Sequence, residues 1–218
     1  QRLFETPRTS WQDYDKSLIS QGGGVFSRSA KTIELTPEIK ALLDIEADTV
    51  DPTTLMQAIL KARAELLYFG GIGTYIKGGG ETNAQAGDKA NDAIRINGGD
   101  VRALVLGEGA NLGATQLGRI EAARAGMRLN TDAIDNSAGV DSSDHEVNIK
   151  ILTGGAIASG NLKAEDRNAL LKSMTDEVGL KVLVHNYDQT LAVSLQEAEG
   201  AEALDAQQVF MQHLASVG

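Results

Sequence analysis

Two short connections between residues 101 and 140 constrain the fold of this chain more than any other feature. The apolar run VRALVLG ends in glycine and leads through a polar turn into a helical pattern, and MRLNTDAI repeats that order before DNSAGV. The periods predict strand, turn, helix, strand, turn, helix. Connections this short favour a parallel sheet with helices packed on it, and ligands of such sheets bind beyond the carboxyl ends of the strands. We therefore expect the turns at 108–111 and 135–139 to lie at one ligand-binding edge.

The composition of the 218 residues argues against several classes of protein. A net charge of −10 disfavours a nucleic-acid binder, because such proteins need a basic surface to neutralise phosphates. Neither a run of about 18 apolar residues nor a signal-peptide pattern occurs, so neither a membrane span nor export is indicated. The absence of cysteine fits a cytoplasmic location. Since the first residue is Gln rather than Met, we expect the chain to be a piece of a longer polypeptide.

The first hundred residues predict helices and strands in alternation. Thr36-Pro37 and Asp51-Pro52 each combine a capping side chain with proline, which predicts helices over TPEIKALLDIE and PTTLMQAILKARAELL. LLYFGGIGTYI reads as a buried strand broken by glycines, and GGGVFSRSAKTIEL as a glycine turn feeding a strand. Residues 77–99 are rich in Gly and Asn, and we expect a surface excursion around a short polar helix.

The residues after Gly160 have no strand signal and predict three helices. One of these helices carries an apolar stripe at helical spacing. The stripe consists of Leu183, Tyr187, Leu191 and Leu195.

Two glycine-rich loops could let a backbone approach a phosphate closely, namely GGG at 22–24 and GGIG at 70–73. Neither matches a phosphate-binding loop, and neither supplies G-x-G-x-x-G between a strand and a helix. Taken alone, each is better read as a tight turn. For the second loop, the ligand-binding interpretation is better supported, because the loop follows an apolar run. That position places it at the same sheet edge as the two turns above.

The helix after Ile134 carries two small polar side chains on an otherwise apolar face. That face is formed by Asn136, Val140, Ser143, Val147 and Ile151. In the structural interpretation, Asn136 caps the helix and Ser143 bonds back to a main-chain carbonyl. In the functional interpretation, the face looks into a cleft and both side chains are neutral hydrogen-bonding groups for a ligand.

No metal site is expected. The three histidines, His145, His185 and His213, show no ligand spacing and there is no cysteine. A nucleophile elbow of the form G-x-S-x-G is absent as well.

Six separated phrases, in order, resemble the glutamate dehydrogenases, and in particular the very large bacterial NAD-specific class. They are SWQDYDKSLIS with GGGVFSRSAK, FGGIGTYIK, GDKANDAIRING, EGANLGATQLGRIE, TDAIDNSAGVDSSDHEVNIKIL and VHNYDQTLAVSLQEAE. The resemblance implies an α/β fold in two parts. Residues 1–135 would be the later part of a Rossmann-like NAD-binding domain, with a partial parallel sheet and flanking helices, and residues 136–218 an all-α segment packing on it.

The resemblance also implies site residues. The cofactor, NAD, would be bound by residues in three phrases: Gly71, Gly73, Thr74, Glu108, Gly109, Asn111 and Asn136. The substrate, L-glutamate or 2-oxoglutarate, would face Val140 and Ser143, with Ser143 bonding its side-chain carboxylate. This sequence departs from the smaller hexameric enzymes at Thr74, where they have Asn, and at Ser137-Ala138, where they have Ala-Gly.

No catalytic residue is assigned within this chain. The resemblance places the family's G-x-G-x-x-G turn, the acidic ribose-binding residue and the proton-transferring lysines and aspartate upstream of Gln1. The implied partners are the rest of a longer polypeptide and, in the full-length protein, further copies of it. Two alternatives remain open: a structural or oligomer-forming module of a large protein, and a stand-alone nucleotide-binding regulator.

Overall fold

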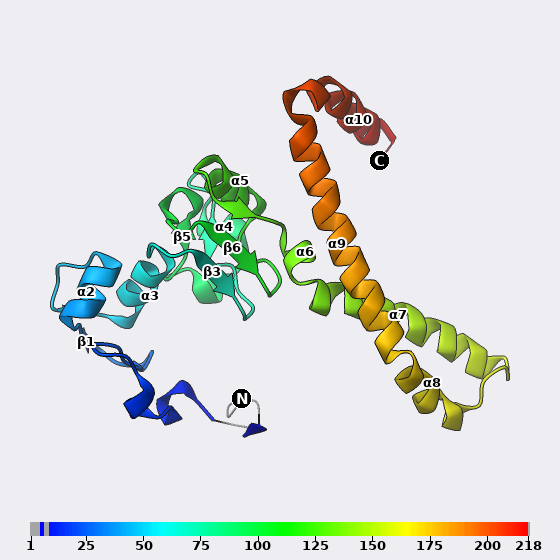
Figure 1. The fold of residues 1–218 in the computed structure, drawn as a ribbon, viewed down its shortest axis with the longest axis horizontal. Coiled ribbons are helices and arrows are strands. Elements are labelled where there is room, and N and C mark those ends of the chain that lie inside the picture. Colours follow the sequence, from blue (N-terminus) through cyan, green and yellow to red (C-terminus); the bar gives the residue numbers. More distant parts are fainter. Residues whose placement is uncertain (1–4, 7–8, 218) are drawn as a thin grey trace. The chain divides into compact units, whose positions relative to one another are not determined.

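The computed structural model describes residues 5–6 and 9–217, which form two compact units, Gln1–Leu129 and Asn130–Gly218 (Figure 1). The first unit is α/β and the second is built from helices. The division lies between Leu129 and Asn130, and the sequence-based division lay after Asp135. Helix α6 (Asp132–Asp135) lies between the two positions and contacts helices of the second unit.

A three-stranded parallel sheet is the centre of the first unit, as the short connections predict. Strand β6 (Val105–Glu108) lies between β3 (Leu66–Phe69) and β7 (Arg128–Leu129). Helix α5 (Gln116–Arg124) connects β6 to β7 and starts where the Thr115 side chain accepts a hydrogen bond from the Gly118 amide. The connection is therefore a parallel crossover through a helix.

The core of this unit lies on one side of the sheet. Its most deeply buried members are aliphatic, as the low aromatic content requires: Ile76, Leu106, Ala114 and Ala122. The other side is open, since Leu66 and Tyr68 of β3 are 56% and 59% exposed.

Residues 77–99 are not the surface excursion that the sequence suggested. Strand β5 (Ile96–Asn97) pairs in parallel with β4 (Ile76–Lys77), and Ile94 and Ile96 are buried. Between these strands lie α4 (Asn83–Ala86) and the 3-10 turn η3 (Lys89–Asn91), and a second 3-10 turn, η4 (Gly98–Asp100), follows β5. The polar composition concealed a segment whose two isoleucines are buried.

The N-terminal part forms a second, smaller core. Helix α2 (Pro37–Leu43) and helix α3 (Pro52–Leu60) begin at the predicted caps, where Thr36 and Asp51 accept backbone hydrogen bonds. Helix α3 ends at Leu60, earlier than expected, because the following residues feed β3.

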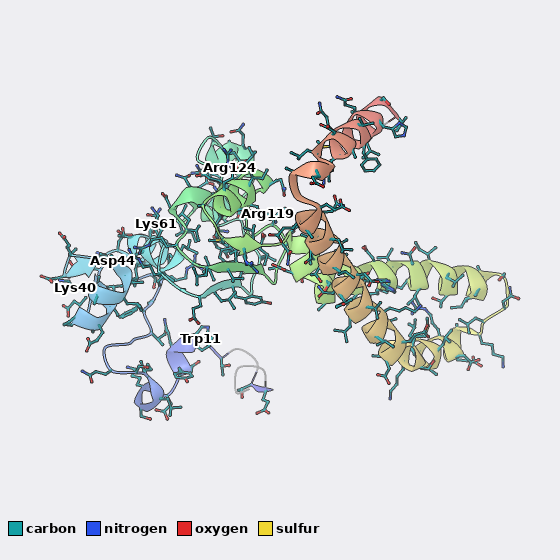
Figure 2. All side chains as sticks on the ribbon, turned by 45° about the horizontal axis from the view of Figure 1, so that its top comes forward. Trp11, Lys40, Asp44, Lys61, Arg119 and Arg124 are labelled. Atoms are coloured by element: carbon teal, nitrogen blue, oxygen red, sulfur yellow. The ribbon has the colours of Figure 1, made fainter. Side chains whose placement is uncertain are left out.

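The strand predicted within 22–35 is reduced to β1 (Ile33–Glu34), which pairs antiparallel with β2 (Thr49–Val50). The described residues before it include the 3-10 turns η1 (Trp11–Asp13) and η2 (Lys16–Leu18). Two ion pairs join this part to the segment before β6: Arg102 with Asp44 at 2.5 Å, and Lys61 with Asp100 at 3.1 Å. Asp44 and Lys61 are labelled in Figure 2.

The second unit is organised by two long helices, α7 (Ser137–Ala158) and α9 (Thr175–Glu199) (Figure 1). Helices α8 (Arg167–Ser173) and α10 (Leu204–Val217) complete it, with 3-10 turns η5 (Ala164–Asp166) and η6 (Gly200–Ala203) before them. Three α-helices in the described residues after Gly160 confirm the prediction. The buried positions of α7 and α9 are few, among them Ser137, Thr153 and Val182.

The predicted stripe on α9 is not the face that packs within this unit. Its four residues are 41–70% exposed, whereas Val182 is buried. Among the described helices, none is long and apolar enough to cross a bilayer.

Candidate cofactor and substrate site

The sheet brings the glycine loop after β3 and the predicted turn after β6 to one edge. Strands β3 and β6 pair in parallel, with Phe69 opposite Glu108, so both chains leave the sheet at the same level. The glycine loop at 70–73 and the turn at 109–113 therefore start side by side. This is the arrangement expected of residues at the carboxyl ends of adjacent parallel strands.

The two turns are also tied to each other by main-chain hydrogen bonds. The Tyr75 amide donates to the Gly113 carbonyl at 2.8 Å, and the Thr115 amide donates to the Ile76 carbonyl at 2.9 Å. Leu112 in the second turn adopts a left-handed conformation, with φ of 53°, which is rare for a branched residue. The turn after β6 is thus held in one shape from both ends.

Glu108 has a structural role that the sequence did not reveal. Its side chain is fully buried, and Arg119 of α5, which is labelled in Figure 2, donates to both carboxylate oxygens, at 2.6 and 2.8 Å. The same carboxylate accepts the Ala114 amide at 3.0 Å. This paired fork fixes helix α5 to the end of β6. A contact between Glu108 and a cofactor would therefore involve its main chain.

Thr74 is likewise buried and held by its main chain. Its amide donates to Asp88 at 2.8 Å, and its carbonyl accepts from the Arg95 guanidinium at 2.8 Å. Arg95 also donates to Asn83 at 3.0 Å and to Asp92 at 2.6 Å. This network fixes the main-chain conformation at the end of the glycine loop. No motif in the sequence indicated that Arg95 lies at its centre.

Hydrogen bonding also determines the charge state of this network. The Asn91 side chain and then the Thr74 amide lower the pKa of Asp88 below its ordinary value of 3.8, since both donate to the ionised carboxylate. Asp88 therefore remains an anion beside Arg95 at neutral pH.

The other sequence-predicted residues of this edge are accessible. Gly71 and Asn111 are exposed, and Gly73 and Gly109 are half-buried. Gly73 has a φ of +136°, a backbone conformation that side chains rarely tolerate, so glycine is required there. A cavity of about 240 Å³ opens beside Gly71 and is lined mainly by apolar and aromatic side chains, including Ile59, Phe69 and Tyr75.

The remaining three predicted site residues belong to the second unit. Residues 132–135 are helical and α7 begins directly after Asn136, so the third connection is a junction of two helices rather than an open turn. The Asn136 side chain makes no capping hydrogen bond. Val140 and Asn136 are half-buried and Ser143 is exposed, so this face of α7 is accessible to a ligand.

Asn186 of α9 fixes the start of α7. Its amide donates to the Ile134 carbonyl at 2.7 Å and to the Ser137 hydroxyl at 3.0 Å. A polar residue in the middle of an amphipathic helix was the available signal for this contact, within the phrase VHNYDQT.

The described part of the second unit also brings together three metal-ligating side chains that lie apart in sequence. Asp141 and His145 of α7 and His185 of α9 have ligand atoms that all lie within 4.8 Å of one another. The expectation that no histidines share ligand spacing considered only distances along the chain, whereas the packing of α7 on α9 brings two of the histidines close to Asp141.

The fold and the site define the class of this protein. A parallel crossover unit with two ordered turns at one sheet edge, followed by helices, is an α/β arrangement suited to ligand binding beyond the strands. The family model for the catalytic domain of bacterial NAD-glutamate dehydrogenase matches residues 1–196. The chain belongs to that family.

Curated relatives agree with this assignment. The chain is 56% identical over 204 residues to the NAD-specific glutamate dehydrogenase of Pseudomonas aeruginosa, which covers 94% of the chain. It is 50% identical to the protein of that name from Halomonas elongata over its whole length, and 51% identical to that from Mycobacterium tuberculosis over 98% of it. The chain spans only 13–14% of the length of these relatives.

Proposed function

We propose that this chain is the part of an NAD-dependent glutamate dehydrogenase that positions the nicotinamide end of the cofactor and the substrate. The full-length enzyme would convert L-glutamate, NAD⁺ and water to 2-oxoglutarate, ammonium, NADH and a proton. The observation that carries the proposal is the parallel pairing of β3 with β6, which sets two of the family-like turns side by side. The sheet would then be part of a Rossmann-like domain, in a cytoplasmic homo-oligomer.

The residues of the first unit would act through geometry rather than through charge. Gly71 and Gly73 allow the main chain to approach the cofactor closely, and Asn111 offers an accessible amide. Glu108 and Thr74 would contribute main-chain groups, because their side chains are buried. The cofactor supplies the hydride acceptor, and the protein holds the reacting carbon atoms in contact.

The residues of α7 would bind the substrate. Ser143 donates a neutral hydrogen bond that suits a carboxylate, and Val140 offers an apolar contact one turn earlier. Asn136 would bond the nicotinamide ribose. Neutral groups orient polar ligand atoms without adding a charge near the reacting centre.

A serine pair makes this assignment testable in the full-length enzyme. Ser143→Ala should raise the KM for glutamate about tenfold or more, because a hydrogen bond to a charged group is lost. Ser142→Ala is the matched control, since the neighbouring serine points elsewhere on the helix, and it should leave the KM unchanged. Asn136→Ala should instead raise the KM for NAD. Equal effects of the two serine variants on the glutamate KM would contradict the assignment.

A structural or oligomer-forming role is the second candidate. The observation that favours it is the exposed apolar stripe of α9, in which Leu183 and Tyr187 are 70% and 65% exposed. The same serine variants separate the two roles. Altered substrate affinity with unchanged assembly in analytical ultracentrifugation supports the site, whereas disturbed assembly with unchanged affinity supports the structural role.

A further inference from the structure

The packing of α7 against α9 creates a cluster of two imidazoles and one carboxylate. Asp141 and His145 are one turn apart on the face of α7 that meets α9, and His185 projects from α9 toward them. The distance from Asp141 Oδ2 to His185 Nδ1 is 2.9 Å, and that from Asp141 Oδ1 to His145 Nδ1 is 3.3 Å. The two imidazole rings are 5.5 Å apart between centroids and inclined by 33°.

These distances match those required for a bound transition metal. Zinc–nitrogen and zinc–oxygen bonds of about 2.0–2.2 Å in a tetrahedral site put neighbouring ligand atoms about 3.4 Å apart. All three ligand atoms of this cluster lie within 4.8 Å of one another.

Burial and charge also suit a dication. The side chains of Asp141 and His145 are 19% and 22% exposed, and that of His185 is 46% exposed. The cluster is thus partly shielded but open on the α9 side, where water could complete the coordination.

The nearby lysines do not compete for the Asp141 carboxylate. Lys150 pairs with Glu146, and Lys181 pairs with Glu177 at 3.5 Å. A carboxylate with two neutral imidazoles carries one negative charge, which attracts a divalent cation.

One ring nitrogen already has a partner that would orient it. His145 Nδ1 lies 2.9 Å from the Asp141 main-chain carbonyl. A metal bound at Nδ1 would replace this contact, whereas a metal bound at Nε2 would retain it as a hydrogen bond that orients the ring, an arrangement common at histidine metal sites. The ligand set of two imidazoles, one carboxylate and an open position suits zinc better than calcium or magnesium, which prefer oxygen ligands.

We propose that Asp141, His145 and His185 form a zinc-type transition-metal site that fastens α7 to α9. The inference concerns these three side chains alone and does not depend on the dehydrogenase function. A metal bound there joins two helices at a point adjacent to Val140, so it would rigidify the face of α7 described above.

The first experiment measures metal binding by the full 218-residue chain, purified without a polyhistidine tag. Titration with Zn²⁺ in a calorimeter should show one saturable site per chain. Co²⁺ should bind with the visible absorption of a four-coordinate ion, a signature that needs no variant. The absence of saturable Zn²⁺ binding would overturn the proposal.

The second experiment identifies the ligands. His145→Gln and His185→Gln should each weaken Zn²⁺ binding by at least about tenfold, and should shift the Co²⁺ spectrum. His213→Gln on α10 is the matched control, because His213 is exposed and lies outside the cluster; it should bind Zn²⁺ like the parent chain. Circular dichroism at each step verifies that the variants are folded. Binding that survives His145→Gln and His185→Gln, or that is lost in His213→Gln, contradicts the assignment.

Discussion

At the scale of single residues, the buried pair of Glu108 and Arg119 determines the end of β6. Both side chains are almost inaccessible, at 0% and 8% exposure, and they share two hydrogen bonds. A buried ion pair loses much more when one partner is removed than when both are replaced, because the remaining charge stays buried without compensation.

Glu108→Gln is therefore expected to lower the free energy of unfolding by about 3–5 kcal/mol. Replacing both residues, as Glu108→Gln with Arg119→Met, should recover part of this loss. Urea denaturation of the chain measures both values, with Glu46→Gln, an exposed carboxylate, as the control. The opposite outcome is that the two losses of unfolding free energy simply add. In that case the double variant would be less stable than Glu108→Gln by as much as Arg119→Met alone destabilises the chain, and the two side chains would not interact.

The ionisation of Asp88 makes the stability of this region depend on pH. Its pKa is lowered in the folded chain by the Asn91 side chain and the Thr74 amide, so it binds protons less readily when folded than when unfolded. Its contribution to stability is complete above the unfolded pKa of about 3.9 and is lost as the pH falls toward the lower folded value.

The stability of Asp88→Asn should accordingly change less between pH 5 and pH 2.5 than that of the parent chain, an interval of about 2.5 units that includes the ordinary aspartate pKa. The measurement is a series of urea titrations at fixed ionic strength. Asp176→Asn, an exposed aspartate of the second unit, should leave the slope unchanged. If the unfolding free energy of Asp88→Asn changed with pH as steeply as that of the parent chain, the loop network would not depend on this carboxylate.

At the scale of elements, the main chains of η4 and α5 lie close together at Gly98. A methyl group at Gly98 would lie 2.3 Å from the Gly118 carbonyl oxygen and 3.1 Å from the Ala122 nitrogen, both of them backbone atoms. Because neither atom can rotate away, the two elements would have to separate.

Gly98→Ala should therefore destabilise the chain by about 1–3 kcal/mol, the usual cost of overpacking a tight contact. Gly80→Ala is the matched control, since nothing lies within 4 Å of a methyl group there. Thermal unfolding followed by circular dichroism compares the two. Equal unfolding temperatures for the two variants would indicate that η4 and α5 are not held together in solution.

At the scale of the whole molecule, the proposed roles and the exposed surfaces bear on what this chain can do alone. In the proposed function, the residues assigned to cofactor and substrate would bind and orient their ligands, and no residue of this chain is assigned to proton transfer. The sheet also leaves Leu66 and Tyr68 exposed on one face, and α9 leaves Leu183 and Tyr187 exposed. The chain spans only 13–14% of its curated relatives.

The isolated 218-residue chain is expected to form no NADH from glutamate and NAD. The measurement is absorbance of NADH in the presence of saturating glutamate, with a full-length relative as the positive control. Glutamate-dependent NADH formation by the chain would show that it contains its own proton-transferring residues. Saturable NAD binding in a calorimeter would instead revive the interpretation as a nucleotide-binding regulator.

The sequence by itself determined the local elements and the family. Caps at Thr36 and Asp51 act within one turn of their own helix, so their signals are readable from neighbouring residues. The parallel order of β6 and β7 also followed from the short connection between them, because a crossover of that length has few alternatives. Phrases such as EGANLGATQLGRIE identified the family, because their resemblance extends over many residues at once.

Tertiary structure alone decided the partners of the polar side chains. Three sets of hydrogen bonds join residues that lie 11 to 49 positions apart in the sequence, and no local pattern encodes such distances. They are the bonds of Arg119 to Glu108, of Arg95 to Thr74 and of Asn186 to Ser137. The meeting of His185 with Asp141 across 44 positions has the same origin. Hydrogen bonds and metal ligands depend on where helices pack, which is set by the sum of many weak apolar contacts rather than by the residues that finally meet.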